Sequence, residues 1–264
     1  MDRILAARLE LMMTTSSIHV TDQSPVLWIE LDDPDRRNAM TIEMLDELLE
    51  VIDAASKRDD LASILLSGRG RCFCAGFDLG AVVEDPMMLD ELIRRLGMVT
   101  KSLRRMPQTV VVAAHGAAIA GGCALLTGGD VVFIDERTVA GYPVHALGVS
   151  PAVTIPTLRQ IIGDGPAREL LLGGELLKSD GIMRIGLGTH LAPEGTVIEH
   201  ATAWAREAAS RSSSAMKATK TWLNALDGSD DDDSFSGPVA GSAALTGQDE
   251  AVELLAEFWK QRNA

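Results

Sequence analysis

RCFCAGFDL at residues 71–79 and HGAAIAGGCA at residues 115–124 are the two stretches that decide the fold. Each follows an apolar, strand-like run, at residues 62–66 and Thr109–Ala114 respectively, and each turns sharply through glycine. Turns of this kind leave backbone N–H groups outside the hydrogen bonding of the sheet, free to point into a cleft. Two N–H groups that point at one place form an oxyanion hole, which stabilises negative charge developing on a carbonyl oxygen. The second turn also opens a predicted helix, whose dipole adds positive potential there.

A third stretch, PDRRNAM at residues 34–40, precedes the two turns. The three stretches together resemble the signature of the crotonase (enoyl-CoA hydratase/isomerase) superfamily, and the resemblance covers the chain from about Val20 to the C-terminus. It implies an α/β fold, a crotonase-like spiral of ββα units with a C-terminal helical trimerisation region. It also implies an acyl-CoA thioester as the partner, with CoA as part of the substrate and with no separate cofactor or metal.

The resemblance assigns the oxyanion hole to two backbone donors. In AGFDL at residues 75–79 the donor is the residue after glycine, Phe77, and in AGGC at residues 120–123 it is the middle position, Gly121. We expect Gly121 to lack a side chain because the ligand lies too close to the backbone there. The same resemblance implies a set of substrate- and CoA-binding residues: Arg36, Arg37, Ala39, Cys74, Ala75, Phe77, Asp78, Leu79, Ala118, Gly121, Ala124 and Val144.

The positions where this family usually carries two catalytic glutamates hold Ala124 and Val144. A hydratase uses both carboxylates to orient and deprotonate the water that adds across the double bond. Alanine and valine move no proton, so the chain is identified as a divergent member in which standard hydration is not supported. His145 is the best surviving catalytic acid/base candidate, because imidazole titrates near neutral pH. On a strand, however, His145 and Val144 would face opposite sides, and a structural histidine stays an equal alternative.

Five further polar residues near these motifs are interpreted as structural. Tyr142 is expected to be a buried phenol, and His115 a packing or turn residue at a strand end. Glu84 and Asp85 are expected to be solvated at the start of a helix, next to a proline. Ser150 is expected to cap a helix.

The 264-residue chain is 46% hydrophobic and 23% charged, which is typical of a globular protein with one large core. Its net charge of -14 argues against nucleic acid and anionic membranes as partners, and no apolar run reaches 18 residues. A polyanionic CoA then needs a local basic patch. Arg36 and Arg37 either meet its phosphates or form an exposed pair at a helix entry, and both readings stay open. The cysteines, Cys72, Cys74 and Cys123, suit buried hydrophobes in a reducing cytoplasm better than disulfides or a zinc site.

Strand-like and helical patterns alternate through the first part of the chain. Strands are predicted at Val26–Leu31, residues 62–66, Thr109–Ala114 and residues 130–134, with helices that follow Thr41 and begin at about Pro86. Strands joined by helical crossovers form a parallel sheet. The later part is mainly helical, and the acidic residues 227–238 are predicted to be a solvated loop between two helices. We predict an N-terminal extension at residues 1–13, a spiral core at residues 14–195 and a C-terminal helical region at residues 196–264.

Two classes of function stay open. In the first, the chain is a lyase or isomerase of atypical mechanism that stabilises the enolate of an acyl-CoA, as in fatty acid metabolism; a decarboxylase or a C–C hydrolase fits this class. In the second, the chain is a pseudoenzyme that binds acyl-CoA without turnover. The resemblance also implies a homotrimer or a dimer of trimers, and Phe258 and Trp259 on the final helix agree with this because a single chain would cover them poorly.

Overall fold

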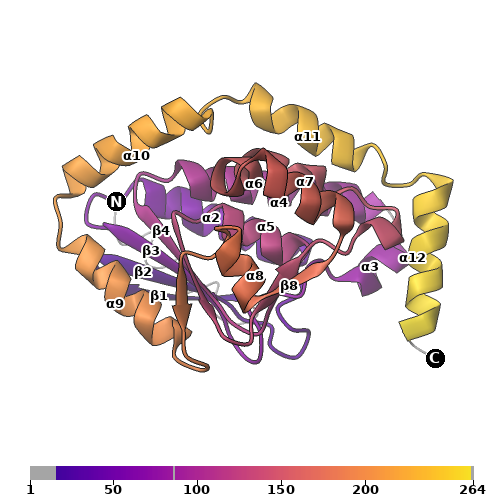
Figure 1. Ribbon diagram of the computed structural model, residues 1–264, viewed down its shortest axis with the longest axis horizontal. Helices are drawn as coiled ribbons and strands as arrows, with labels where there is room; N and C mark the ends of the chain where they lie inside the picture. The colour runs from indigo at the N-terminus through magenta and orange to yellow at the C-terminus, as the bar shows by residue number, and fades with distance from the viewer. Residues whose placement is uncertain (1–15, 86, 263–264) are drawn as a thin grey trace.

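A six-stranded sheet forms the centre of the computed structural model, which describes residues 16–85 and 87–262 (Figure 1). Its strands, in spatial order, are β1 (Ile18–Gln23), β2 (Val26–Leu31), β3 (Ser63–Gly68), β4 (Thr109–Ala114), β6 (Val131–Asp135) and β9 (His190–Ala192). β1 and β2 are antiparallel, and the other neighbours are parallel. The prediction of a parallel sheet with crossover connections is therefore confirmed.

Helices lie on both faces of this sheet and continue beyond it (Figure 1). The earlier ones are α2 (Ile42–Ser56), α3 (Leu79–Glu84), α4 (Met87–Arg105), α5 (Gly121–Thr127), α6 (Ile155–Ile162), α7 (Asp164–Gly173) and α8 (Ser179–Arg184), with the 3-10 helices η1 (His145–Leu147) and η2 (Pro151–Thr154). The C-terminal ones are α9 (Val197–Ala209), α10 (Ser213–Asp227), α11 (Asp233–Ala243) and α12 (Asp249–Arg262). α2 begins after Thr41 as predicted, because the Thr41 hydroxyl accepts the N–H of Met44.

The central strands are buried on both faces, so they read in the sequence as continuous apolar runs. Ile64 and Val112 belong to the main core, which α2, α4 and α5 cover. Leu65 and Val111 alternate with them and belong to a second core under α9. Successive side chains of a strand point to opposite faces, which explains this division.

A second, smaller sheet lies next to the glycine turns. β5 (Ala117–Ile119) pairs parallel with β7 (Val139–Gly141), and β7 pairs antiparallel with β8 (Leu176–Lys178). The chain therefore passes from one sheet to the other and then into a helix, as β4, β5 and α5, and again as β6, β7 and η1. This repeat is the spiral of ββα units that the sequence predicts.

The C-terminal helices run around the outside of the core, from α9 and α10 on the left of Figure 1 through α11 to α12 on the right. α12 packs back on its own chain: the ring of Trp259 lies 3.3 Å from the point where a side chain on Gly80 would begin. Phe258 is 36% exposed. The expectation that both aromatic residues lack cover on one chain is therefore wrong for Trp259. The division at residue 196 stays a prediction, and residues 1–13 lie outside the described part of the chain.

The acidic stretch at residues 227–238 is only partly the solvated loop that the sequence predicts: residues 230–232 are exposed between α10 and α11, and the stretch is helical from Asp233 onward. α11 begins within it, and the Asp232 carboxylate lies 2.7 Å from Lys101 Nζ and 2.6 Å from an Arg105 guanidinium nitrogen. Both cations stand near the C-terminal end of α4, where the helix dipole favours positive charge. They lower the pKa of Asp232 to about 2. Asp232 stays 73% exposed, and the sequence did not indicate its ion pairs because both partners lie far away in the chain.

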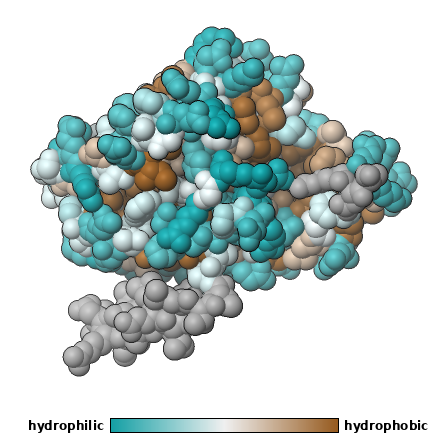
Figure 2. Space-filling view, turned by 90° about the horizontal axis from the view of Figure 1, so that it is seen from below, coloured by the Kyte–Doolittle hydropathy of each residue, from teal (hydrophilic) through white to brown (hydrophobic). Residues whose placement is uncertain are grey.

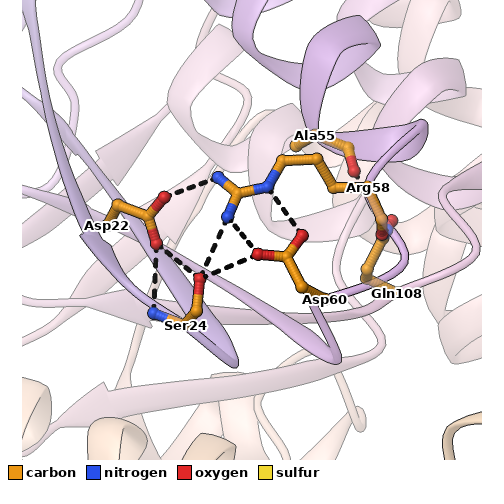
Figure 3. A network of polar contacts seen from close by, with 6 residues as sticks. All are labelled: Asp22, Ser24, Ala55, Arg58, Asp60 and Gln108. Atoms are coloured by element: carbon orange, nitrogen blue, oxygen red, sulfur yellow. Dashed lines mark hydrogen bonds and ion pairs between the residues drawn. The ribbon is translucent and has the colours of Figure 1, made fainter. Parts of the chain in front are cut away.

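A network around Arg58 fixes the β1–β2 hairpin to the connection between α2 and β3 (Figure 3). The Arg58 guanidinium lies 2.6 Å from the Asp22 carboxylate, donates to Ser24 Oγ at 3.0 Å and pairs with Asp60. Hydrogen bonding to Arg58 lowers the pKa of Asp60 to about 2. Gln108 donates its side-chain amide to the Arg58 carbonyl at 3.0 Å, which brings the start of β4 into the same network.

On the face that Figure 2 shows, hydrophilic side chains dominate and apolar ones form separate patches. Within residues 16–85 and 87–262, no helix has both the length and the apolar character needed to cross a membrane.

Candidate active site

The two glycine turns predicted from the sequence lie against each other. A bridge pairs Cys74 with Ala118, and the N–H of Ile119 donates to the Cys74 carbonyl at 3.0 Å. The point where a side chain on Gly76 would begin lies 3.9 Å from the backbone nitrogen of Gly121. The structure thus brings the AGFDL and AGGC turns, more than 40 positions apart in the printed sequence, into direct contact.

Met40 determines which way the backbone of Phe77 points. Met40 and Phe77 form a parallel bridge, in which the Met40 N–H donates to the Gly76 carbonyl at 2.8 Å and the Asp78 N–H donates to the Met40 carbonyl at 3.0 Å. In a parallel pairing, the residue between two such bonds directs its own N–H and C=O away from the partner strand. Among the described residues, no hydrogen bond uses the N–H of Phe77.

The second turn contains a strained residue. Ala120 has φ 51° and ψ -110°, a conformation that residues with a Cβ seldom adopt, and its N–H donates to the Gly141 carbonyl at 2.8 Å. Gly121 follows as the first residue of α5, so its N–H has no partner within the helix. The N–H of Gly121 enters no hydrogen bond to any other part of the chain that the structure describes. Both predicted donors are therefore backbone groups on adjoining turns that find no partner in the part of the chain that the structure describes.

Gly121 lies against the end of the Met40 side chain. A Cβ on Gly121 would begin 2.3 Å from Met40 Cε, 3.4 Å from Leu96 Cδ2 and 3.5 Å from Phe77 Cε1. A Cβ at this distance would require the terminal methyl group of Met40, at the end of a flexible side chain, to shift. Packing against Met40 therefore favours glycine at this position, and the expectation that a ligand approaches this backbone stays a prediction.

Asn38 explains the role of the PDRRNAM stretch. Its side chain is fully buried, with Nδ2 donating to the carbonyls of Arg69, Cys72 and Phe73 at 2.9, 3.0 and 3.0 Å. Its Oδ1 accepts the N–H of Asp33 at 2.9 Å. Asn38 has φ 53°, which asparagine tolerates better than most residues. The asparagine therefore fixes the loop to the segment that leads into the first turn.

The basic residues near this loop divide into paired and unpaired ones. Arg36 lies between two carboxylates, 2.6 Å from Asp33 and 2.8 Å from Asp78, and these raise its pKa further. Arg37 is partly buried and Arg71 is exposed, and neither forms an ion pair within the described residues. Arg71 is not among the binding residues predicted from the sequence, because a single arginine before a turn forms no distinctive pattern.

The remaining predicted binding residues lie along the same two segments. Asp78 caps α3, its carboxylate accepting the N–H of Gly80 at 3.1 Å, and Leu79 begins that helix and packs against the main core. Ala75 donates its N–H to the Arg37 carbonyl at 3.1 Å. The others range from partly to fully buried: Ala39, Cys74 and Ala118.

The positions of the usual glutamates are apolar in structure as well as in sequence. Ala124 is 1% exposed, and its N–H donates to the Ala120 carbonyl at 2.9 Å. Val144 is partly buried against the main core and precedes η1. Neither residue brings a proton-transfer group to the turns.

The sequence pattern suggests a strand at His145, but the structure places this residue outside any strand. β7 ends at Gly141, a tight turn follows in which the Val144 N–H donates to the Tyr142 carbonyl at 2.8 Å, and His145 begins η1. His145 is exposed and lines a cavity of about 190 Å³ between η1 and the start of α12. Ser150, Gln248 and Glu250 are its other side-chain polar groups.

The polar residues interpreted as structural have structural contacts. The Tyr142 hydroxyl is buried 2.9 Å from Thr154 Oγ1, and burial raises the pKa of Tyr142 well above its usual value. His115 Nε2 lies 2.9 Å from the Gly70 carbonyl. Glu84 is exposed at the end of α3, rather than at the start of a helix, and the Asp85 carboxylate accepts the N–H of Met87 at 3.0 Å. The Ser150 hydroxyl caps η2 as predicted.

The three cysteines are buried free thiols, as predicted. Burial raises the pKa of Cys74 and of Cys123 to about 12, so both are protonated near neutral pH and neither is a nucleophile. In the described ranges, no group of three or more His, Cys, Asp or Glu side chains is arranged to hold a metal ion.

Adjoining glycine turns at the ends of a parallel sheet, within a spiral of ββα units, define a protein of the crotonase fold. A solved enoyl-CoA hydratase from Bacillus halodurans superposes with a TM-score of 0.83 over 92% of this chain and 100% of its own, at 24% identity. Residues 21–233 match the family described as enoyl-CoA hydratase/isomerase. The chain belongs to this family, and so to the crotonase superfamily.

Two relatives illustrate the range of the family. A Thermus thermophilus protein whose name refers to enoyl-CoA hydratase is 30% identical over 246 residues, which is 91% of this chain and 97% of the relative. The 2,3-dehydroadipyl-CoA hydratase of Escherichia coli is 28% identical over 209 residues, covering 79% of this chain and 82% of the relative.

Proposed function

We propose that this protein binds an acyl-CoA thioester with its carbonyl oxygen between the N–H groups of Phe77 and Gly121, and stabilises the enolate that forms from it. One observation carries the proposal: two adjoining turns each leave one backbone N–H unpaired among the described residues. Donors of this kind are fixed before the reaction, so they stabilise developing charge without reorganisation. The names of the relatives, which refer to acyl-CoA chemistry, agree with this choice of ligand.

The reaction class follows from the side chains around the turns. Ala124 and Val144 stand at the usual glutamate positions, so these two positions supply no carboxylate pair to activate water. An atypical lyase or isomerase reaction with His145 as acid/base, decarboxylation, and C–C hydrolysis are compatible with this arrangement. Binding without turnover, as a pseudoenzyme, is the alternative that the apolar character of both positions favours.

The CoA nucleotide requires positive charge in an acidic protein. Arg37 and Arg71 flank the segment that leads into the first turn, and both lack an ion-pair partner among the described residues. Arg36 already neutralises two carboxylates. We therefore assign the phosphate contacts to Arg37 and Arg71 first, with Arg36 in a lesser role.

The oxyanion hole can be tested with two ligands that differ by one oxygen. Butyryl-CoA carries the thioester carbonyl, and S-butyl-CoA is the matched thioether without it. Two hydrogen bonds contribute about 1 to 3 kcal/mol in total, so butyryl-CoA should bind about 5- to 150-fold more tightly in calorimetry. Equal affinities for the two ligands, or no binding of either, would sink the proposal.

A substrate panel separates the enzyme from the pseudoenzyme. The protein is incubated with enoyl-, acyl- and malonyl-type CoA thioesters, and products are followed by mass spectrometry. Turnover of a malonyl-type ester alone supports decarboxylation. Tight binding with no product in any sample supports the non-catalytic alternative.

We also propose that the chain assembles as a homotrimer or a dimer of trimers, and α10 supplies the support. Its buried residues are polar, Lys220 and Asn224, whereas Trp222, Leu223 and Leu226 are 68%, 59% and 82% exposed. A helix with its apolar side chains outward is explained if a second copy covers them. Light scattering should show a multiple of 28.1 kDa, and Trp222→Asp should shift it toward the monomer. A wild-type monomer at micromolar concentration contradicts this.

A further inference from the structure

Met40 contacts both turns of the candidate oxyanion hole. Through its backbone it holds the first turn, accepting the N–H of Asp78 and donating to the Gly76 carbonyl. Through its side chain it reaches the second turn, where Met40 Cε occupies the space beside the Cα of Gly121. The residue is fully buried, so its side chain packs within the core.

The end of the Met40 side chain lies close to the backbone of Gly121. A Cβ there would begin 2.3 Å from Met40 Cε, so the two residues fill one space between them. Phe77 Cε1 lies 3.5 Å from the same point, which puts the side chain of the first donor residue in the same cluster. Interiors are close-packed, and a change of one methyl group is transmitted to its neighbours.

We propose that Met40 is a positioning residue that sets the separation of the Phe77 and Gly121 N–H groups. This inference rests on the proposed function, because the separation matters only if both groups bind one oxygen. Methionine suits the task because its unbranched thioether chain reaches across the gap and fills an irregular space. Met40→Ala would leave the second turn without support on that side, while the backbone bonds that hold the first turn remain available.

The experiment measures how well each variant senses the carbonyl oxygen. We define the selectivity as the Kd of S-butyl-CoA divided by the Kd of butyryl-CoA. A displacement of about 1 Å in such a site costs up to roughly 100-fold. Met40→Ala should therefore lower the selectivity toward 1, with little change in the affinity for free CoA. Unchanged selectivity in a folded Met40→Ala protein overturns the proposal.

A double-mutant cycle with Gly121→Ala tests the shared space. In the wild-type background, the added methyl group meets Met40 Cε and should lower both selectivity and thermal stability. In the Met40→Ala background the space is free, so the same substitution should have a smaller effect. Contacting residues couple by roughly 2- to 150-fold. Strict additivity, as expected if a ligand excluded the methyl group, would refute the inference.

Two controls keep the outcome interpretable. Met44 is equally buried, and none of the contacts described for the turns uses it, so Met44→Ala should lose stability but keep its selectivity. If Met40→Ala does not fold, Met40→Leu replaces it as a variant of similar volume, with a smaller expected loss of selectivity.

A wild-type selectivity of 1 would remove the proposed function without deciding the role of Met40. In that case the amide NMR signals decide: Met40→Ala should shift the signals of Phe77 and Gly121, and Met44→Ala should not. Unshifted signals refute the positioning role separately from the binding proposal.

Discussion

Replacing Asn38 should destabilise the protein more than replacing any exposed residue of the same loop. Its side chain supplies two N–H donors to three backbone carbonyls and one acceptor to the Asp33 N–H, all from a fully buried position. Loss of about three net hydrogen bonds costs about 2 to 4 kcal/mol, and buried carbonyls left unpaired place the value in the upper part of that range. Since a domain is stable by about 5 to 15 kcal/mol, this is a large fraction.

Three substitutions at this position separate the contributions. Asn38→Gly tolerates φ 53° and loses only the side-chain contacts, whereas Asn38→Ala loses the contacts and adds about 1 kcal/mol for the positive φ. Asn38→Asp keeps the size, but it places carboxylate oxygens against the carbonyls of Arg69, Cys72 and Phe73. We expect it to be at least as destabilising as Asn38→Ala.

Urea unfolding measures the free energy of unfolding of each variant. All variants have to be compared at the same protein concentration, because the apparent stability of an oligomer rises with concentration. The order of stability should be wild type, then Asn38→Gly, then Asn38→Ala. An Asn38→Asp variant within about 0.5 kcal/mol of wild type would contradict the hydrogen-bonding account, since ordinary surface substitutions fall in that range. Equal stability of the glycine and alanine variants would contradict the conformational part.

Three further results are expected. The turnover number for hydration of crotonyl-CoA should fall far below the usual value of about 1 to 10³ s⁻¹, because each missing acid/base group removes a factor of roughly 10² to 10⁴. An ordinary turnover number in a spectrophotometric assay contradicts the assignment of Ala124 and Val144 to the glutamate positions. Lys101 and Arg105 depress the pKa of Asp232 from 3.8 to about 2, so these ion pairs stabilise the fold fully above about pH 4 and lose this effect as the pH falls toward 2. Urea titrations at several pH values should therefore show a smaller loss of stability in acid for Asp232→Asn than for the wild type. The same acid profile for both proteins refutes this expectation. Lys220→Met leaves the mostly buried Asp130 without its cation and should lower the free energy of unfolding by about 3 to 5 kcal/mol. Lys217→Met removes the cation of the exposed Asp59 and should lower it by less than about 1 kcal/mol. Similar unfolding midpoints for the two variants contradict this expectation.

The features that the sequence predicts correctly depend on local patterns. Apolar runs that end in glycine turns identify β3 and β4, and Thr41 marks the start of α2. The chain order of strands and helices then leaves few arrangements other than a parallel sheet. Both glycine turns were likewise found from short motifs, because their conformations depend on glycines within them.

The features that the sequence misses depend on contacts between distant segments. Nothing near Gly121 in the sequence indicates that Met40 fills the place of its side chain. The sequence of residues 227–238 likewise does not indicate that Asp232 pairs with two cations of α4 or that a helix begins at Asp233. Val144 and His145 have a strand-like composition, but a tight turn follows Tyr142 and His145 begins η1, where it lines a cavity. The alternation of side chains along a strand therefore does not apply to these two residues.

The strength of two hydrogen-bond donors sets a bound on the chemistry under the proposed function. One such donor is worth about 10² to 10³ in kcat, so two supply roughly 10⁴ to 10⁶ together if their effects add. Enzymes accelerate their reactions by 10⁶-fold or more, and a hydratase obtains part of this from general acid/base groups. With alanine and valine at those positions, the remainder has to come from positioning or from the substrate itself. A substrate that releases carbon dioxide supplies its own electron pair and requires no base to form the enolate. For this reason the malonyl-type esters are the members of the panel on which the enzymatic reading depends most.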